Sequence, residues 1–278
     1  MVSVAAIVLT APVAAIVSAQ EAPPMAFEVA SVKPNPAGPG SSFIRRQPGG
    51  NFQVSNMTVR DLITFAYQIQ GFQLVGGPDW TRNDRFDIAA KAGRDLPPTG
   101  FGGTAPEMLM LRALLEERFG LAVRRETREM PIYALVMARD DGQPGPQLRR
   151  SQTDCAALMK KASAPGAAPI PQGDGGRPLC GLTGRTGMLM AGGFPISEFP
   201  RFLSGQVQRV VVDRTGLTGD WDFDLKFTPT QLTTNDAPST EASSLFTALQ
   251  EQLGLKLEST RGPVEVLVID RIEPPTPD

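Results

Sequence analysis

An internal repeat constrains the fold of this chain more than any other feature of its sequence. Three blocks agree with three later blocks in the same order: 50–91 with 187–228, 115–121 with 249–255, and 131–137 with 263–269. Chance agreement of apolar residues explains one such block but not three in order. Self-similarity of this kind is typical of a duplicated structural unit. The sequence therefore predicts two diverged copies of one unit.

The first half of each copy is predicted to be a strand, a helix and a second strand. In the first copy, residues 52–54 alternate like a strand, and Thr58 can cap the following helix with Asp61 reaching back to it. A turn at 76–78 leads to a strand at 85–91. Apolar side chains at helical spacing in between predict one buried helix face.

The second half of the unit is predicted to be a helix followed by a hairpin. Thr104 and Glu107 form a capping box that opens this helix, and Gly120 stands where a left-handed C-terminal cap belongs. Two short strands follow, at 123–125 and 132–137. We expect them to pair with each other and close the unit.

The second copy repeats this order, with Ser197 as the cap of its first helix. Its other elements are strands near 188–190, 210–212 and 221–227, a helix holding Leu245, Leu249 and Leu253, and strands at 256–258 and 264–269. A further strand at 27–32 precedes the first copy. The predicted fold class is α+β, with two tandem duplicated units, each a small sheet packed against two helices.

The N-terminus resembles a secretory signal peptide. An uncharged run rich in Ala, Val and Ile ends at Val17-Ser18-Ala19, whose small residues suit a cleavage site. The run is too short to favour a permanent membrane span. We expect a periplasmic or extracellular protein without stable membrane insertion after cleavage. The predicted organisation is a signal peptide at 1–19, a first unit at 20–140, a Gly/Pro/Ala-rich linker at 141–186, a second unit at 187–273 and a disordered tail at 274–278.

The chain has two cysteines, Cys155 and Cys180. An even number of cysteines in an exported protein predicts a disulfide bond. In the chain-entropy model the loop that it closes is worth about 3.5 kcal/mol. A redox-active pair is disfavoured because the spacing is not C-x-x-C. We therefore predict a structural bridge within the linker.

Composition excludes several classes of function. The chain has no histidine, which removes Ser-His-Asp and Cys-His catalysis and His-containing zinc sites. Two cysteines are too few for a Cys-only zinc site. The 27 basic and 29 acidic side chains nearly cancel, so no basic face for nucleic acid is predicted. No catalytic residue, metal ligand or cofactor motif is predicted.

Several polar residues still invite a functional interpretation. Asp213-Arg214-Thr215-Gly216 is similar to the Asp-Thr/Ser-Gly loop of aspartic proteases, but its spacing differs by one residue, and a turn is favoured. Asp79, Asp84 and Asp87 are candidates for a carboxylate pair of the glycosidase type. The alignment makes Asp224 the counterpart of Asp87, which favours a role in the shared fold. Solvated or arginine-paired carboxylates are the commoner outcome.

The two tryptophans, Trp80 and Trp221, are candidate contact residues, with core packing as the alternative. Each lies beside a strand and near a glycine-rich turn. Together with Asp79, Asp213 and Arg214 they make up the predicted contact set.

Five motifs in order resemble a soil-associated bacterial family of exported proteins of unknown function. They are the segments 27–34, 76–80 (Gly-Gly-Pro-Asp-Trp), 211–219 (Val-Val-Asp-Arg-Thr-Gly-Leu-Thr-Gly), 253–255 (Leu-Gly-Leu) and 266–270 (Val-Leu-Val-Ile-Asp). Some members of that family are fused to membrane metallopeptidase sensors. Each copy is also distantly similar to the short N-terminal domain of secretins and TonB-dependent receptors, a protein-contact module. Neither resemblance supplies a catalytic residue.

These observations favour a non-enzymatic extracytoplasmic module that binds an envelope protein or a small ligand, with a sensory role as one form of it. The alternative is a carboxylate-based hydrolase of the cell envelope. The two hypotheses differ in what they require of Asp79, Asp84, Asp87, Asp213 and Asp224. An enzyme needs two of them to converge in a pocket, with a raised pKa. A binding module does not.

Overall fold

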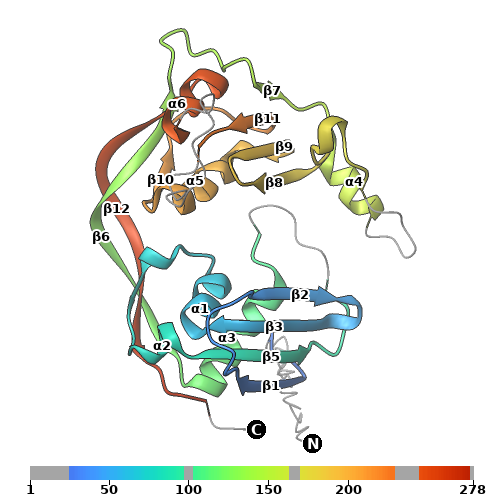
Figure 1. Ribbon diagram of the computed structural model, residues 1–278, viewed down its shortest axis with the longest axis vertical. Helices are drawn as coiled ribbons and strands as arrows, with labels where there is room; N and C mark the ends of the chain where they lie inside the picture. The colour runs from blue at the N-terminus through green and yellow to red at the C-terminus, as the bar shows by residue number, and fades with distance from the viewer. Residues whose placement is uncertain (1–24, 97–102, 163–169, 229–243, 276–278) are drawn as a thin grey trace, which may run out of the picture.

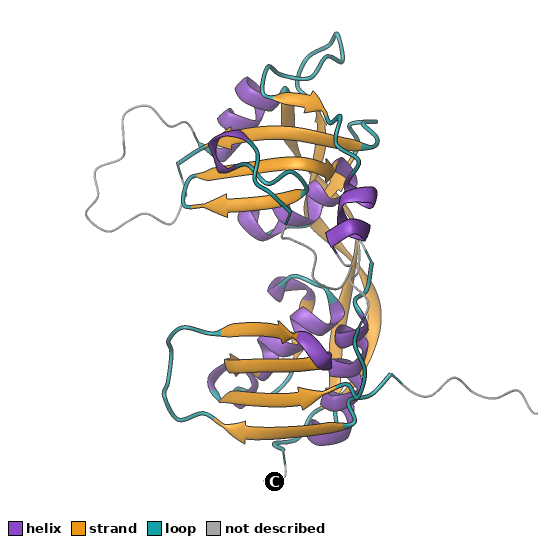
Figure 2. Cartoon of the chain, turned by 90° about the vertical axis from the view of Figure 1, so that its right-hand side faces the viewer, coloured by secondary structure: helices purple, strands orange, loops and turns teal. Residues whose placement is uncertain are grey.

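The computed structural model describes residues 25–96, 103–162, 170–228 and 244–275. The predicted signal peptide at 1–19 and the last three residues of the predicted tail lie outside these ranges. Two lobes, each built on a four-stranded sheet, are joined by a long two-stranded ribbon (Figure 1). Figure 2 shows the two sheets at opposite ends of the molecule. The mixture of helices and sheets confirms the α+β class.

The two lobe sheets have the same strand order. The first is β1–β5–β3–β2 and the second is β7–β11–β9–β8. The strands of the first sheet are β1 Val29–Pro34, β5 Arg85–Lys91, β3 Asn51–Thr58 and β2 Phe43–Gln47. Those of the second are β7 Leu148–Arg150, β11 Asp220–Lys226, β9 Met188–Pro195 and β8 Gly181–Arg185. All neighbouring strands within the two sheets are antiparallel.

The two lobe sheets match in the register of their central strand pairs as well as in strand order. In the central pairs, Val54 lies opposite Ile88 in the first sheet, and Ala191 lies opposite Phe223 in the second. Both pairs of strands carry a register shift at the next step along the strands, after which Met57 faces Phe86 and Phe194 faces Trp221. Residues in the same place of the two registers are called corresponding residues below. Such matching is what a duplication would leave, although common descent stays a prediction.

The register corrects one part of the sequence alignment. Because Ile88 corresponds to Phe223, Asp87 corresponds to Asp222 and not to Asp224. The same hydrogen bond marks both positions. The backbone N–H of Asn56 donates to Asp87 over 2.8 Å, and that of Gly193 donates to Asp222 over 2.8 Å. The alignment missed this because Asp222 and Asp224 both lie between apolar residues, as Asp87 does, and a constant shift of 137 residues selects Asp224.

Most of the helices contribute to the cores beneath the two sheets. In the first lobe the helices are α1 Val59–Tyr67, the short α2 Trp80–Asn83 and α3 Pro106–Phe119, with the 3-10 turns η1 Pro48–Gly50 and η2 Gly71–Gln73. The second lobe holds η4 Ile196–Glu198, α5 Phe199–Val207, α6 Leu245–Ala248 and the π-helical turn η5 Leu249–Leu253. It also holds α4 Cys155–Ala162 and η3 Asp174–Gly176, which belong to the loop between β7 and β8.

Helix starts follow the sequence signals only in part. The Thr58 cap is confirmed, because its side chain accepts from the backbone N–H of Asp61 over 3.1 Å. The predicted Thr104 cap is wrong: Ala105 precedes the helix and Pro106 fixes its first turn. Glu107 is instead buried and forms an ion pair with Arg46.

The predicted cap at Ser197 is also wrong. Residues Ile196–Glu198 form a 3-10 turn, and α5 begins after it at Phe199. Pro200 lies within the first turn of that helix, where a missing N–H costs nothing. Both lobes nevertheless end their last helix as predicted, since Gly120 and Gly254 adopt left-handed φ values of 58° and 67°.

The ribbon replaces the two predicted hairpins. β6 runs without a break over Ala122–Met137, and β12 runs over Leu255–Arg271. The two strands pair with each other along their whole length, from Ala122 opposite Arg271 to Met137 opposite Leu255. The prediction that 123–125 folds back onto 132–137 is therefore wrong. Each unit gives its last strand to the other lobe.

The two short remaining strands show the same exchange. β4 Leu74–Gly76 of the first lobe lies parallel to β12, with Leu74 opposite Leu267. β10 Val211–Asp213 of the second lobe lies parallel to β6, with Val211 opposite Tyr133. Together these four strands form a third sheet, in the order β10–β6–β12–β4.

Each buried core includes side chains from the strand that crosses over from the other lobe. The core of the first lobe contains Leu267 and Ile269 from the end of β12, and the core of the second contains Leu135 from the end of β6. A smaller cluster lies at the middle of the ribbon, where Ile132 and Val266 are buried. Burial of side chains from the partner unit ties the two lobes together.

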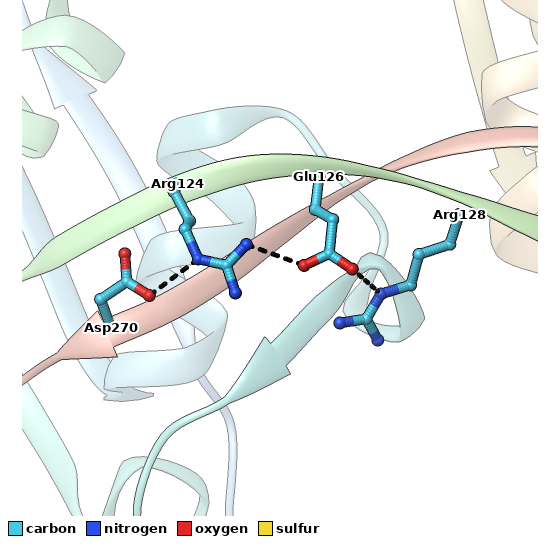
Figure 3. A network of polar contacts seen from close by, with 4 residues as sticks. All are labelled: Arg124, Glu126, Arg128 and Asp270. Atoms are coloured by element: carbon cyan, nitrogen blue, oxygen red, sulfur yellow. Dashed lines mark hydrogen bonds and ion pairs between the residues drawn. The ribbon is translucent and has the colours of Figure 1, made fainter.

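The outer surface of the ribbon carries a ladder of charges (Figure 3). Arg124 donates to Asp270 over 3.0 Å and to Glu126 over 2.8 Å, and Arg128 donates to the other oxygen of Glu126 over 2.7 Å. Side-chain hydrogen bonds from Arg128 and Arg124 lower the pKa of Glu126 to about 2. These contacts lie at the first-lobe end of the ribbon.

The described residues of the segment predicted to be a linker belong to the second lobe. Residues 141–186 contain β7, α4 and β8, and the two strands form the edges of the second sheet. The loop between these strands is far longer than the corresponding connection from β1 to β2. Its high content of Gly, Pro and Ala is typical of a linker, which is why the sequence predicts one there.

Candidate functional site

The outer face of the second sheet carries a row of carboxylates. Along β11, Trp221, Phe223 and Leu225 are buried, while Asp220, Asp222 and Asp224 alternate with them and are half-buried. Successive side chains of a strand point to opposite faces, so the three carboxylates share the face away from the core.

The disulfide loop lies directly over this face. The sulfur atoms of Cys155 and Cys180 are 2.09 Å apart, which confirms the predicted bond. Beneath the loop, β9 carries Gly192 and Gly193. A Cβ atom at Gly192 would overlap the carbonyl oxygen of Pro178, and one at Gly193 would overlap the sulfur of Cys155. Two consecutive glycines in this strand therefore allow the loop to approach.

A depression of about 450 Å³ opens between this loop and the sheet. Its charged walls are Arg149 from β7, Arg177 from the loop and Asp222 from β11, and Thr153 and Gly192 also line it. Its size is within the range of small-molecule sites in proteins, about 300–1,000 Å³.

The charged side chains of the depression differ in how many of their hydrogen-bonding positions already have a partner. Arg177 is bound to Asp224 through two contacts, of which the Nε–Oδ1 hydrogen bond is 3.2 Å long. Asp222 accepts the N–H of Gly193, and Arg149 donates to the carbonyl of Pro146 over a long 3.4 Å. A carboxylate and a guanidinium each have several hydrogen-bonding positions, so both groups keep capacity for a ligand.

The corresponding carboxylate of the first lobe is sealed by side chains. Asp87 accepts hydrogen bonds from Asn35 Nδ2 at 2.9 and 3.0 Å, from Ser55 Oγ at 3.0 Å and from the N–H of Asn56. Partial burial raises the pKa of Asp87, but the three hydrogen-bonding partners outweigh it and the pKa is lowered. Ser55 and Asn56 correspond to Gly192 and Gly193. Gly192 thus lacks the hydroxyl that Ser55 donates to Asp87, while Gly193 keeps the backbone hydrogen bond that Asn56 makes.

The predicted contact residues do not come together. Asp79 is exposed and contacts Arg82 over 3.4 Å, and Trp80 is half-buried against the core of the first lobe. Asp213 and Arg214 are exposed at the end of β10, in the second lobe. The carboxylate of Asp213 accepts the backbone N–H and the hydroxyl of Thr215, both at 2.8 Å, which is the turn chemistry that the sequence favoured.

Trp221 is a core residue. Its side chain is 5% exposed, and its indole N–H donates to the carbonyl of Thr218 over 3.0 Å. The guanidinium of Arg150 lies 5.0 Å from the centre of the ring. A tryptophan held in this way supports the sheet beneath the depression rather than meeting a partner at the surface.

The five candidate acids of the hydrolase hypothesis have separate surroundings. Asp79 meets Arg82, Asp87 meets Asn35 and Ser55, Asp213 meets Thr215 and Asp224 meets Arg177, while Asp84 is exposed. They are spread over both lobes. The pKa of Asp87 is lowered, which is opposite to the shift that a general acid needs.

Sequence reasoning missed the residues of the depression. Arg149 and Arg177 lie in the segment predicted to be a linker, and the alignment gives the place of Asp222 to Asp224. The available signal was the Gly192-Gly193 pair within a strand, since glycine inside a strand marks a close approach of another backbone. Only the structure shows what approaches.

Within the described residues, no group of three or more Cys, Asp and Glu side chains is arranged to hold a metal ion. No helix in the same part of the chain is long and apolar enough to cross a membrane.

A family model described as a protein of unknown function, DUF3738, matches residues 60–272. The chain belongs to the DUF3738 family. The match begins in α1 and ends just after β12, so it includes both exchanged strands and the depression. No curated protein and no solved structure matches the chain. The structure of this DUF3738 protein is therefore interpreted from its own residues.

Proposed function

We propose that the protein is an exported binding module of the cell envelope and that it binds a small ligand in the depression of the second lobe. The observation that carries the proposal is the difference between two corresponding carboxylates. Asp87 is closed in by Asn35 and Ser55, whereas Asp222 faces an open depression. Two lobes with matching registers differ most where one of them leaves a polar group accessible.

The disulfide loop supports binding at this place. It forms one wall of the depression and is held on the sheet by the Cys155–Cys180 bond. A wall fixed in this way loses little conformational freedom when a ligand binds, which favours affinity. We infer that the long loop between β7 and β8 was added to a shared unit to make this wall.

Export is supported by the same bond. Disulfides persist in oxidising compartments, which agrees with the signal peptide predicted at 1–19. We also infer that the two lobes descend from one duplicated unit, because strand order, register and the Asp87 and Asp222 hydrogen bonds all recur. The resemblance of each unit to a protein-contact domain of secretins belongs to the same proposal and points to an envelope location.

A thermal-shift screen tests the proposed function. The full chain is heated with each member of a panel of small polar compounds of the envelope, and the midpoint of unfolding is measured. We expect at least one compound to raise the midpoint of the unsubstituted protein but not that of Asp222→Asn. Asp220→Asn is the matched control, because Asp220 lies on the same face of β11 outside the depression.

Two results would reject the proposal. One is a panel in which no compound raises the midpoint. The other is a stabilising compound that acts equally on the protein and on Asp222→Asn, since it would bind somewhere else.

A further inference from the structure

We infer that the ligand of this depression is a small zwitterion of the amino-acid or short-peptide type, with an ammonium group at Asp222 and a carboxylate at Arg149. This inference rests on the proposed function and adds the chemical class of the ligand.

The charge balance of the depression carries the argument. Arg177 and Asp224 neutralise each other through two contacts. What remains is one cation, Arg149, and one anion, Asp222. A ligand with a single charge would meet its partner but would also be placed near a like charge, which is unfavourable. A ligand with both charges satisfies both walls.

Strand register sets the distance between the two remaining groups. Arg149 of β7 lies directly opposite Asp222 of β11. Directly opposed residues of an antiparallel pair have Cβ atoms about 4.5–5.5 Å apart on one face of the sheet. The two side chains nevertheless turn to different partners, Arg149 to Pro146 and Asp222 to Gly193. Each therefore presents its charge to the depression without first breaking an ion pair with the other.

The hydrogen-bonding chemistry agrees with this class of ligand. Arginine binds a carboxylate with two parallel N–H donors, and a carboxylate accepts readily from an ammonium group. The hydroxyl of Thr153 adds one donor and acceptor at the rim. The volume of about 450 Å³ holds an amino acid or a dipeptide and excludes a long chain in its entirety.

The first lobe shows why the site occurs once among the described residues. Lys33 lies opposite Asp87, in the place that Arg149 has opposite Asp222. Asp87 Oδ1 accepts from Asn35, Ser55 and the backbone N–H of Asn56, and Oδ2 accepts from Asn35, so both carboxylate oxygens already have partners within the lobe. The first lobe thus supplies a matched control within the same molecule.

Titration calorimetry with three matched probes tests the inference on the full, disulfide-bonded chain. The probes are glycylglycine, its N-acetylated form, which lacks the ammonium group, and its C-terminal amide, which lacks the carboxylate. A hydrogen bond to a charged group is worth about 1.5–3 kcal/mol, so we expect each blocked probe to bind at least about tenfold more weakly than glycylglycine.

Three variants assign each charge to its residue. Arg149→Gln is expected to bind glycylglycine and its amide equally, because the group that distinguishes them is gone. Asp222→Asn is expected to bind glycylglycine and its acetylated form equally. Lys33→Gln, the substitution at the corresponding position of the first lobe, is expected to behave as the unsubstituted protein does.

The inference is overturned if the blocked probes bind as well as glycylglycine, if the two site variants keep the full discrimination, or if no probe binds. In each of these cases the thermal-shift panel decides whether the proposed function is also rejected. If one of its compounds stabilises the protein through Asp222, the binding function is supported, and the ligand belongs to another class. If no panel compound acts either, both the ligand class and the binding function are rejected.

Discussion

Among single residues, the two lobes differ most in the surroundings of one carboxylate, Asp87 in the first lobe and Asp222 in the second. Asp87 and Asp222 occupy the same place in two sheets and accept the same backbone hydrogen bond. Around Asp87 the chain supplies Asn35 and Ser55, and around Asp222 it supplies glycine and a loop. A residue that stabilises one lobe is thereby made available for binding in the other.

Substitution of the two carboxylates should therefore affect different properties. We expect Asp87→Asn to lower the free energy of unfolding by about 1–2 kcal/mol, because the amide cannot accept from Asn35, Ser55 and Asn56 together. Asp222→Asn should cost clearly less, since one oxygen still accepts from Gly193. Urea denaturation of both variants measures the difference, and an equal or larger loss for Asp222→Asn would contradict it.

Glu126 makes the ribbon sensitive to acid. Its pKa in the folded protein is about 2, below the usual 4.5, because Arg128 and Arg124 hydrogen-bond to the charged form. A lowered folded pKa gives stability that is present above pH 4.5 and is lost as the pH falls from there to about 2.

The expected result is a urea midpoint that falls over this pH window, and falls less in Glu126→Gln. The change is small, since exposed ion pairs contribute little. A variant whose midpoint falls as steeply as that of the unsubstituted protein would show that the ladder of charges in Figure 3 does not contribute to it.

Local signals in the sequence predicted some of these residues and not others. The cap at Thr58 and the turn at Asp213 could be predicted, because each depends on a partner within three positions along the chain. The Thr104 capping box failed for a reason beyond that range. Glu107 is drawn into an ion pair with Arg46 of β2, which no local pattern reveals.

Among the strands, the pairing of β6 with β12 could not be predicted from the apolar pattern, because that pattern does not specify which strand pairs with which. Residues 123–125 were expected to pair with 132–137, yet Arg125 lies opposite Leu267 and Tyr133 lies opposite Ser259. The aligned residues Leu74 and Val211 lie opposite Leu267 and Tyr133, so Leu267 has the place in the first lobe that Tyr133 has in the second. An exchange between two like units keeps the same kind of partner for each residue, so the apolar pattern is identical in both arrangements. Only the course of the chain through 126–131 separates them.

The disulfide loop is the element that most distinguishes the second lobe. We expect Cys155→Ala/Cys180→Ala to lower the free energy of unfolding by about 3.5 kcal/mol, the loop entropy that the bond removes from the unfolded chain. Chemical denaturation under non-reducing conditions measures this loss. The unsubstituted protein, reduced and alkylated, serves as the second form without the bond. A loss near zero in both would mean that the loop is held on the sheet by other contacts.

At the scale of the whole molecule, exchange makes the two lobes interdependent. The first core needs Leu267 and Ile269, and the second needs Leu135, so each lobe is incomplete without the strand of the other. A contact outside the ribbon agrees with this, since the side chain of Gln70 donates to the carbonyl of Arg201 over 3.2 Å. We therefore expect the lobes to unfold together.

The two tryptophans allow this to be measured, because Trp80 reports on the first lobe and Trp221 on the second. In Trp221→Phe and in Trp80→Phe, the fluorescence of the remaining tryptophan should change at the same denaturant concentration as the far-UV circular dichroism of the whole protein. Fluorescence that changes well before the circular dichroism in either variant would show that one lobe unfolds alone.

Much of this architecture could be predicted from local signals. The α+β class, the strand–helix–strand order in the first half of each aligned segment, the Gly120 and Gly254 caps and the disulfide all follow from them. The exchange of strands and the depression could not be predicted, because both depend on contacts between segments far apart in the chain. The glycines Gly192 and Gly193 indicate that another segment approaches this strand closely. They do not indicate that the approaching residues are Pro178 and Cys155.

We propose that the two lobes differ in function although their registers match, and that the second alone binds a ligand at its carboxylate. The most direct measurement follows two corresponding amides by nuclear magnetic resonance while glycylglycine is added. The N–H of Gly193 donates to Asp222, and the N–H of Asn56 donates to Asp87. The account predicts that the Gly193 resonance shifts and saturates while that of Asn56 stays in place. Equal shifts of both resonances, or a shift of Asn56 alone, would contradict it.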